Sequence, residues 1–156
     1  MLRKRAEPIV ILMADDDADD RLLTRDAMQE SRLGNPFREV EDGQELMDYL
    51  RRKGKYATAD APRPGLILLD LNMPRMDGRE ALEQIKKDPK LRCIPVIILT
   101  TSKTEEDILR SYGLGANSFI TKPVTFDGLV EIVRALNSYW FNIVQLPDGV
   151  VASSHA

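Results

Sequence analysis

The sequence predicts an α/β protein whose core is a doubly wound parallel sheet of five strands, with helices on both faces. Short apolar runs such as residues 8–13, 66–70 and 95–100 have the length and composition of strands that are buried on both sides. Segments with apolar residues at helical spacing separate these runs. A regular alternation of strand and helix favours a parallel sheet, because each parallel connection crosses over through a helix.

Each expected element follows from a local pattern. Residues 18–31 carry leucine, alanine and methionine at helical spacing, and two glycines end the helix expected at 105–115. Residues 54–65 are rich in glycine, proline and alanine and are therefore predicted to be a loop. The expected strands are residues 8–13, 37–42, 66–70, 95–100 and 117–121, and the expected helices are 18–31, 43–53, 78–88, 105–115 and 126–144.

The length and charge of the chain exclude several classes of protein. Its 156 residues fit one domain, expected to span residues 1–147, with a flexible tail at 148–156. The net charge of −3 argues against a nucleic-acid-binding protein, which would carry a basic stripe. The apolar runs are too short to cross a membrane, and the N-terminus shows no signal peptide.

The chain contains one cysteine and one histidine. Cys93 cannot form an intrachain disulfide, which suits a reducing compartment and predicts a cytoplasmic protein. Because Cys93 precedes an apolar run, its thiol is expected to be packed. His155 lies in the last residues, so neither Ser-His-Asp catalysis nor a zinc site is expected.

Polar side chains stand at the carboxyl ends of four of the predicted strands. Asp15 and Asp16 follow the first strand, Asp70 ends the third, Thr100 ends the fourth and Lys122 follows the fifth. Ligands of such sheets bind beyond the carboxyl ends of the strands. We therefore expect one site at this edge of the sheet, built from residues that are far apart in the sequence.

The side chains at this edge suit phosphoryl chemistry. Clustered carboxylates raise each other's pKa unless a cation lies among them, and hard oxygen ligands suit Mg²⁺ or Mn²⁺. A lysine and a threonine hydroxyl can neutralise phosphoryl oxygens, while a carboxylate can accept the group as an aspartyl phosphate. Any one of these acids, taken alone, is explained as well by a helix cap or a turn.

The aspartate run at residues 15–20 is expected to divide between two roles. Asp15 and Asp16 belong to the site. Asp17 is predicted to cap the following helix, and Asp19 and Asp20 to lie in its first turn, where negative charge suits the helix dipole. By this interpretation, Asp20→Asn lowers stability by ~0.5 kcal/mol and leaves phosphorylation intact.

Four stretches together resemble the receiver domain of two-component response regulators. They are Asp15-Asp16, "LLDLNMPRMDG" at 68–78, "LTTS" at 99–102 and "TKP" at 121–123. The resemblance covers residues 8 to about 140. It implies a flavodoxin-like fold with strand order 2-1-3-4-5. It also implies that Asp70 accepts a phosphoryl group from a phosphohistidine of a partner histidine kinase.

The resemblance further implies a role for each remaining site residue. Asp16, Asp70 and the backbone carbonyl of Asn72 would bind Mg²⁺ directly, and Asp15 would act through a water molecule. Lys122 would pair with the phosphoryl group, next to a cis Lys-Pro bond. Thr100 would move onto a phosphoryl oxygen and Phe119 would rotate inward, so that one charged modification biases a two-state element.

The last predicted helix is unusually apolar. Phe126, Leu129, Val130, Val133, Leu136 and Trp140 fit one stripe that faces the core. The apolar residues beyond this stripe predict a protein interface, for which the candidates are Ile132, Tyr139, Trp140 and Phe141. We expect a homodimer formed through the fourth helix, the fifth strand, the fifth helix and the tail.

Residues 138–147 and the loop at 54–65 resemble a subgroup of stand-alone response regulators that are partnered with bacterial phytochromes. This resemblance implies a light-sensing histidine kinase as partner and a protein that signals through its own surface. A phosphate sink and a receiver-like scaffold that takes no phosphoryl group are the alternatives within this fold.

Two other functions are considered from the same residues. A phosphatase or phosphotransferase of the haloacid dehalogenase type requires its nucleophile on the first strand and a second acid two residues later. In this chain the residue two positions after Asp70 is Asn72, which cannot act as a general acid. A flavodoxin-like cofactor carrier cradles phosphate after the first strand. Asp15 and Asp16 at that position would repel phosphate.

Overall fold

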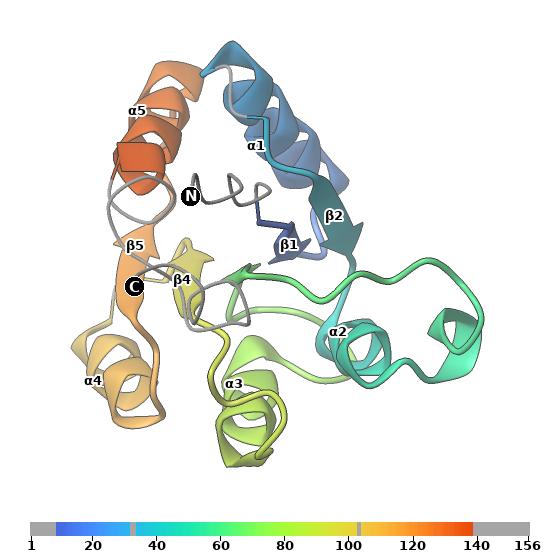
Figure 1. Cartoon of the computed structure of the whole chain (residues 1–156). Coiled ribbons are helices and arrows are strands. Elements are labelled where there is room, and N and C mark those ends of the chain that lie inside the picture. The colour runs from blue at the N-terminus through green and yellow to red at the C-terminus, as the bar shows by residue number, and fades with distance from the viewer. Residues whose placement is uncertain (1–8, 32–33, 103, 139–156) are drawn as a thin grey trace, which may run out of the picture.

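The computed structural model describes residues 9–31, 34–102 and 104–138. They form a parallel sheet with strand order β2-β1-β3-β4-β5, which confirms the predicted fold and order. Helices α1 and α5 pack together over one face of the sheet, and α2 and α3 lie over the other (Figure 1). The strands are Ile11–Ala14, Phe37–Val40, Leu66–Leu69, Val96–Thr100 and Ser118–Thr121; the helices are Ala18–Glu30, Gly43–Arg51, Gly78–Lys87, Glu105–Gly113 and Phe126–Leu136.

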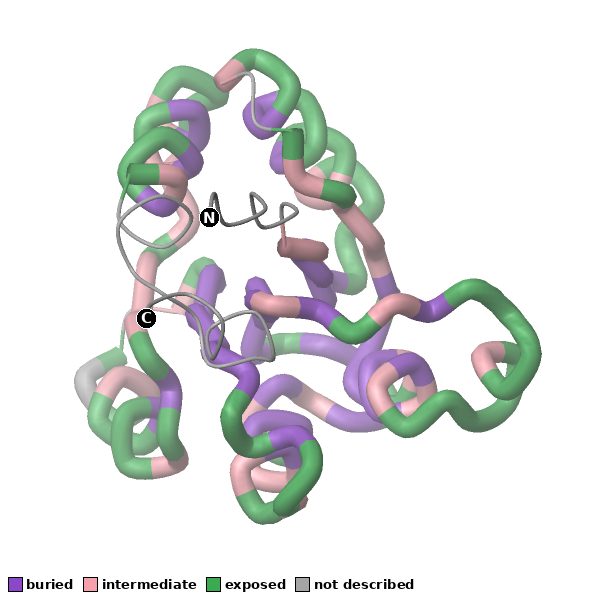
Figure 2. Tube along the Cα trace, in the orientation of Figure 1, coloured by how far each residue is buried: buried purple, intermediate pink, exposed green. Residues whose placement is uncertain are grey.

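Alternation along the central strands builds a separate core on each face of the sheet. In β1, Ile11 and Met13 join the cluster under α1 and α5, whereas Leu12 and Ala14 join the cluster under α2 and α3. All four are buried, as Figure 2 shows for the centre of the sheet. A strand buried on both faces needs a continuous apolar run, which explains the run that the sequence shows here.

Several element boundaries differ from the predicted ones. Helix α2 was expected to reach residue 53 but ends at Arg51, because Arg52 adopts a left-handed backbone with φ of 55°. The predicted loop at 54–65 begins with a short 3₁₀ turn at Gly54–Tyr56. Helix α5 extends to Leu136, and the part of the predicted helix from residue 139 onward lies outside the described residues.

Two burial predictions were wrong. Phe126 is 38% exposed because it is the first residue of α5, at the mouth of the connection from β5, whereas Leu129, Val130, Val133 and Leu136 are buried as expected. Cys93 is exposed, since it lies in the turn before β4 rather than in the strand. Within the part of the chain that the structure describes, no helix is long and apolar enough to cross a membrane.

Candidate functional site

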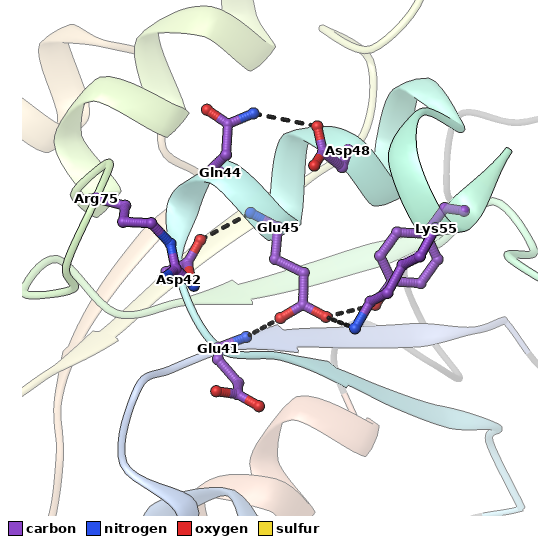
Figure 3. A pocket seen from close by; sticks show the side chains of 8 residues that line it. Glu41, Asp42, Gln44, Glu45, Asp48, Lys55 and Arg75 are labelled. Carbon is purple, nitrogen blue, oxygen red and sulfur yellow. Dashed lines mark hydrogen bonds and ion pairs between the residues drawn. The ribbon is translucent and has the colours of Figure 1, made fainter.

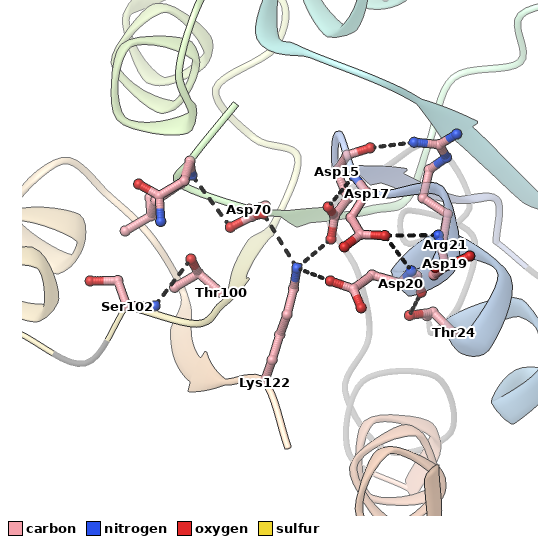
Figure 4. A network of polar contacts seen from close by, with 12 residues as sticks. Asp15, Asp17, Asp19, Asp20, Arg21, Thr24, Asp70, Thr100, Ser102 and Lys122 are labelled. Carbon is pink, nitrogen blue, oxygen red and sulfur yellow. Dashed lines mark hydrogen bonds and ion pairs between the residues drawn. The ribbon is translucent and has the colours of Figure 1, made fainter. Parts of the chain in front are cut away.

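The carboxyl edge of the sheet brings the predicted site residues together. Asp15 directly follows β1, Asp70 directly follows β3, Thr100 ends β4 and Lys122 directly follows β5. Their side chains converge in Figure 4, although more than half of the chain separates the first from the last. The parallel register explains this convergence, because it aligns Ala14 with Leu69 and Thr100 with Thr121.

Three carboxylates at this edge form a group that can hold a metal ion. Asp15, Asp16 and Asp70 each offer an oxygen, and these oxygens lie within 4.8 Å of one another. Asp15 and Asp70 are buried, while Asp16 is exposed at the mouth of the group. A set of hard anionic oxygens with one side open to solvent fits Mg²⁺ or Mn²⁺, which keep several water ligands.

The ammonium group of Lys122 lies among carboxylates. Its Nζ is 2.6 Å from Asp15 Oδ2, 2.8 Å from Asp20 Oδ2 and 3.3 Å from Asp70 Oδ2. Burial disfavours the charge of Lys122, but the hydrogen bonds to Asp15 and Asp20 outweigh it and raise the pKa of the ammonium group. Burial raises the pKa of Asp15 to about 6, although its hydrogen bond from Lys122 opposes this rise. At neutral pH the site therefore contains a paired ammonium and carboxylate.

The structure corrects the expected role of Asp20. Asp17 caps α1 as predicted, because its side chain accepts hydrogen bonds from the backbone amides of Asp19 and Asp20. Asp20, however, also forms an ion pair with Lys122, so its role is not confined to the helix dipole. Because α1 follows β1 directly, its first turn lies at the carboxyl edge of the sheet (Figure 4). The position of Asp20 in this turn could have predicted from the sequence that its carboxylate lies near the site.

Backbone contacts fix the position of Asp70. A Cβ atom on Gly78 would lie 2.1 Å from the carbonyl oxygen of Asp70, so only glycine fits at the start of α3. The Gly78 amide donates to the carbonyl of Leu71 at 2.9 Å. The amide of Asn72 lies 3.4 Å from Asp70 Oδ1, and the Asn72 residue itself is exposed.

The loop after β4 is tied to two helices. Ser102 Oγ donates to Asp107 Oδ2 at 2.6 Å, and Asp107 on α4 also accepts two hydrogen bonds from the guanidinium of Arg79 on α3, at 2.8 and 2.7 Å. Arg79 holds the pKa of Asp107 far below its usual range. Sequence reasoning singled out neither Arg79 nor Asp107, because a pair that joins two helices leaves no periodic signal.

The predicted switch and interface residues are placed only in part. Thr100 is fully buried, and Phe119 is half-buried and packs against the cluster under α2 and α3. Ile132 is half-buried and packs against the other cluster. Tyr139, Trp140 and Phe141 lie outside the described residues. The expected cis Lys-Pro bond is not found: residues 122 and 123 are joined by a trans bond, the ordinary form, and the described residues contain no cis peptide bond.

A polar pocket of about 390 Å³ lies along α2, and none of the predicted site residues lines it (Figure 3). Four of its charged side chains form ion pairs: Arg75 binds Asp42, and Glu45 binds Lys55 at 3.0 Å and also accepts from Tyr56 at 2.6 Å. Asp42 and Glu45 also accept backbone amides at the start of α2. These contacts stabilise the start of α2. We therefore assign the pocket a structural role, and its residues add no reactive group to the site.

Known proteins share both the sequence and the fold. The sequence profile of the response regulator receiver domain matches residues 11–134. Response regulator Rcp1 of Synechocystis sp. is 40% identical over 140 residues, which cover 90% of this chain and 94% of Rcp1. The crystal structure of the Mn²⁺-bound form of Rcp1 superposes with a TM-score of 0.82 at 40% identity, covering 90% of this chain and 100% of that one.

A second solved relative is the phosphorylated cyanobacterial phytochrome response regulator RcpA. It superposes with a TM-score of 0.84 at 42% identity, covering 91% of this chain and 100% of that one. The profile match spans most of the chain and includes every strand and the whole carboxyl edge described above. The chain therefore belongs to the response regulator receiver domain family, the phosphoacceptors that take phosphoryl groups from histidine kinases in two-component signalling.

Proposed function

We propose that Asp70 is the residue that accepts the phosphoryl group, from a phosphohistidine of a partner kinase. The observation that carries this proposal is the meeting of Asp15, Asp16, Asp70 and Lys122 at one edge of the sheet. Lys122 lies closer to Asp15 than to Asp70, and the Asn72 amide contact is long. The oxygens of Asp70 therefore keep lone pairs that are free to attack phosphorus.

The transfer is a displacement at phosphorus. A carboxylate oxygen of Asp70 attacks, the P–N bond to the imidazole breaks, and the imidazole leaves with the bonding electron pair. The ammonium of Lys122 and the hydroxyl of Thr100 then neutralise phosphoryl oxygens. A Mg²⁺ or Mn²⁺ ion held by Asp15, Asp16, Asp70 and the Asn72 carbonyl would supply further positive charge at those oxygens. The same residues give the protein a part in its own phosphorylation and dephosphorylation.

The proposed partner is a histidine kinase of the phytochrome type. Support comes from the 42% identity to RcpA, which is described as a phytochrome response regulator. Rcp1 is described in a Mn²⁺-bound form, and the acidic group of this chain offers the hard oxygen ligands that suit this ion. The proposal includes a cytoplasmic location, where a kinase draws its phosphate from ATP and where the single free thiol suits a reducing environment.

The proposed output is a surface of the receiver itself, formed by α4, β5, α5 and the tail, through which two copies pair. Two exposed side chains on α4 support this surface: Leu109 is 66% exposed and Tyr112 is 48% exposed. Phe119 lies on β5, which follows α4 and precedes α5 in the chain, and it would transmit the movement of Thr100 to this surface. Residues 1–147 would then form one functional domain, followed by the tail at 148–156.

A single labelling experiment tests the phosphoacceptor. The protein is incubated with Mg²⁺ and acetyl phosphate, and its intact mass is measured after acid quenching. We expect one base-labile phosphoryl adduct on the wild type and on Asp60→Asn, which removes an exposed carboxylate of the loop before β3. Asp70→Asn should carry none. An equal adduct on Asp70→Asn, or no adduct on the wild type, would contradict the proposal.

A further inference from the structure

Asp20 stands apart from the other acids of the site. Asp15, Asp16 and Asp70 follow strands, whereas Asp20 lies in the first turn of α1, one turn beyond the cap at Asp17. Its carboxylate nevertheless reaches the ammonium of Lys122 at 2.8 Å (Figure 4). The Lys122 side chain is 11% exposed and that of Asp20 is 33% exposed, so this contact lies at the rim of the site.

The contacts of Lys122 are unequal. Its Nζ hydrogen bonds to Asp15 at 2.6 Å and to Asp20 at 2.8 Å are shorter than its 3.3 Å contact with Asp70. An ammonium group has three protons to donate, so the two shorter bonds use most of its capacity. In Figure 4 the ammonium lies between Asp70 on one side and Asp20 on the other. Asp20 thus draws Lys122 toward α1 and away from Asp70.

We propose that Asp20 is a positioning residue, which holds the ammonium of Lys122 at the rim of the acidic group. This inference rests on the proposed function of Asp70. The hold keeps the oxygens of Asp70 free to attack, and it keeps the carboxylates of Asp16 and Asp70 open to a divalent cation, while Lys122 stays bonded to Asp15. The ammonium nevertheless stays close enough to reach a phosphoryl group on Asp70.

Removal of the Asp20 carboxylate leaves Lys122 with two partners, Asp15 and Asp70. Both belong to the group of oxygens that can hold a metal ion. The ammonium then moves inward, where it competes with a cation for these oxygens and takes a lone pair of the Asp70 carboxylate. Binding of a divalent cation and phosphorylation should therefore weaken together.

Binding of Mn²⁺ alone tests the first consequence, without any phosphodonor. Free Mn²⁺ is measured by electron paramagnetic resonance for Asp20→Asn and for a matched control, Asp19→Asn. The control removes the same charge from the same helical turn, but the Asp19 carboxylate makes no hydrogen bond or ion pair to any other described residue. We expect the affinity to fall roughly tenfold in Asp20→Asn and to change by no more than about twofold in Asp19→Asn.

A double-mutant cycle with Lys122→Met shows whether Asp20 acts through Lys122. Without the ammonium group, Asp20→Asn should weaken Mn²⁺ binding no more than Asp19→Asn does. The conservative variant Asp20→Glu keeps the carboxylate and should recover most of the affinity. Equal affinities of Asp20→Asn and Asp19→Asn, or an Asp20→Asn effect of full size in the Lys122→Met background, would overturn the inference.

The rate of labelling by acetyl phosphate is the second readout. We expect the rate constant at saturating Mn²⁺ to fall roughly tenfold in Asp20→Asn, with Asp19→Asn within about twofold of the wild type. Because Mn²⁺ is saturating, a lower rate constant reflects a less reactive Asp70 carboxylate rather than weaker cation binding. The two proposals can fail separately. If Mn²⁺ affinity falls in Asp20→Asn but not in Asp19→Asn, and yet the wild type takes no phosphoryl group, then the proposed function of Asp70 is wrong while the proposed role of Asp20 is supported.

Discussion

At the scale of single residues, the carboxylates of the site differ in burial and in whether a positive charge neutralises them. Asp15 is fully buried, and at neutral pH it is ionised against the ammonium of Lys122. Asp16 is exposed and forms no ion pair with another described residue. The charge of Asp16 is therefore the one that an incoming cation meets first, since cation binding to it displaces no internal partner.

This difference predicts the effect of Asp16→Asn. The variant loses one anionic oxygen of the metal-binding group, so Mg²⁺-dependent labelling by acetyl phosphate should be abolished and Mg²⁺ affinity should fall. Asp17→Asn is the matched control, because asparagine caps a helix about as well as aspartate and the loss of charge is the same. Mg²⁺ titration calorimetry checks both variants. An unchanged Mg²⁺ affinity in Asp16→Asn would contradict its role as a ligand.

At the scale of elements, side chains join the loop after β4 to helices α3 and α4. Arg79 on α3 holds Asp107 on α4 with two hydrogen bonds, and Asp107 holds Ser102 in the loop after Thr100. A planar guanidinium that binds both oxygens of a carboxylate fixes orientation as well as distance. The loop after β4 therefore moves together with the start of α4.

Replacement of Asp107 by asparagine should loosen this connection. We expect the free energy of unfolding to fall by about 2 kcal/mol, because one charge-assisted pair and the hydrogen bond to Ser102 are weakened. The folded pKa of Asp107 is lowered, so its stabilisation is present at neutral pH and is lost as the carboxylate protonates. The difference from the wild type should thus narrow as the pH falls below about 4.

Urea unfolding followed by circular dichroism measures the Asp107→Asn effect at each pH. Glu106→Gln is the control, since Glu106 is exposed on the same helix and should change stability by less than about 0.5 kcal/mol. A pH-independent difference between Asp107→Asn and the wild type would show that the contact with Arg79 is not what stabilises α4.

The approach of α3 to the Asp70 loop predicts opposite effects for two glycines. Gly78→Ala places a Cβ atom against the Asp70 carbonyl and should lower the free energy of unfolding by about 1–3 kcal/mol. Gly113→Ala meets open space at the end of α4 and should leave stability unchanged or raise it by up to about 1 kcal/mol. Thermal unfolding compares the two. A neutral Gly78→Ala would mean that α3 can shift without disturbing Asp70.

At the scale of the whole molecule, the sheet separates two cores, and neither core covers two large side chains of α4. The cluster under α1 and α5 and the cluster under α2 and α3 account for the buried apolar side chains of the sheet. Leu109 and Tyr112 remain exposed on α4, where neither cluster covers them. Apolar side chains gathered on one side of a small domain favour a contact with another protein.

The proposed pairing of two copies predicts a change in solution mass. Wild-type protein should sediment as a dimer in at least one of two states, with or without a phosphoryl mimic. The double variant Trp140→Ala plus Phe141→Ala should be monomeric in both. Leu22→Ala plus Leu23→Ala is the control, because it removes two exposed leucines from α1 and should leave the dimer intact. A wild type that is monomeric in both states would refute the pairing.

The sequence by itself determined the fold class and most of the site. Short continuous apolar runs that alternate with helical segments favour strands that are buried on both faces, and parallel strands share one carboxyl edge. The positions of Asp15, Asp70, Thr100 and Lys122 at the ends of such runs were therefore enough to predict their convergence. These inferences succeed because they depend only on periodicity along the chain.

The tertiary structure alone decided which side chains pair across elements. The bond from Lys122 to Asp20, the hold of Arg79 on Asp107 and the fit of Gly78 against Asp70 each join two elements that pack at a particular distance and angle. The exposure of Phe126 and Cys93 likewise depends on where one element ends against its neighbours. Periodicity along the chain specifies the face that a helix buries, whereas packing between elements sets which polar groups on its ends come within hydrogen-bonding distance.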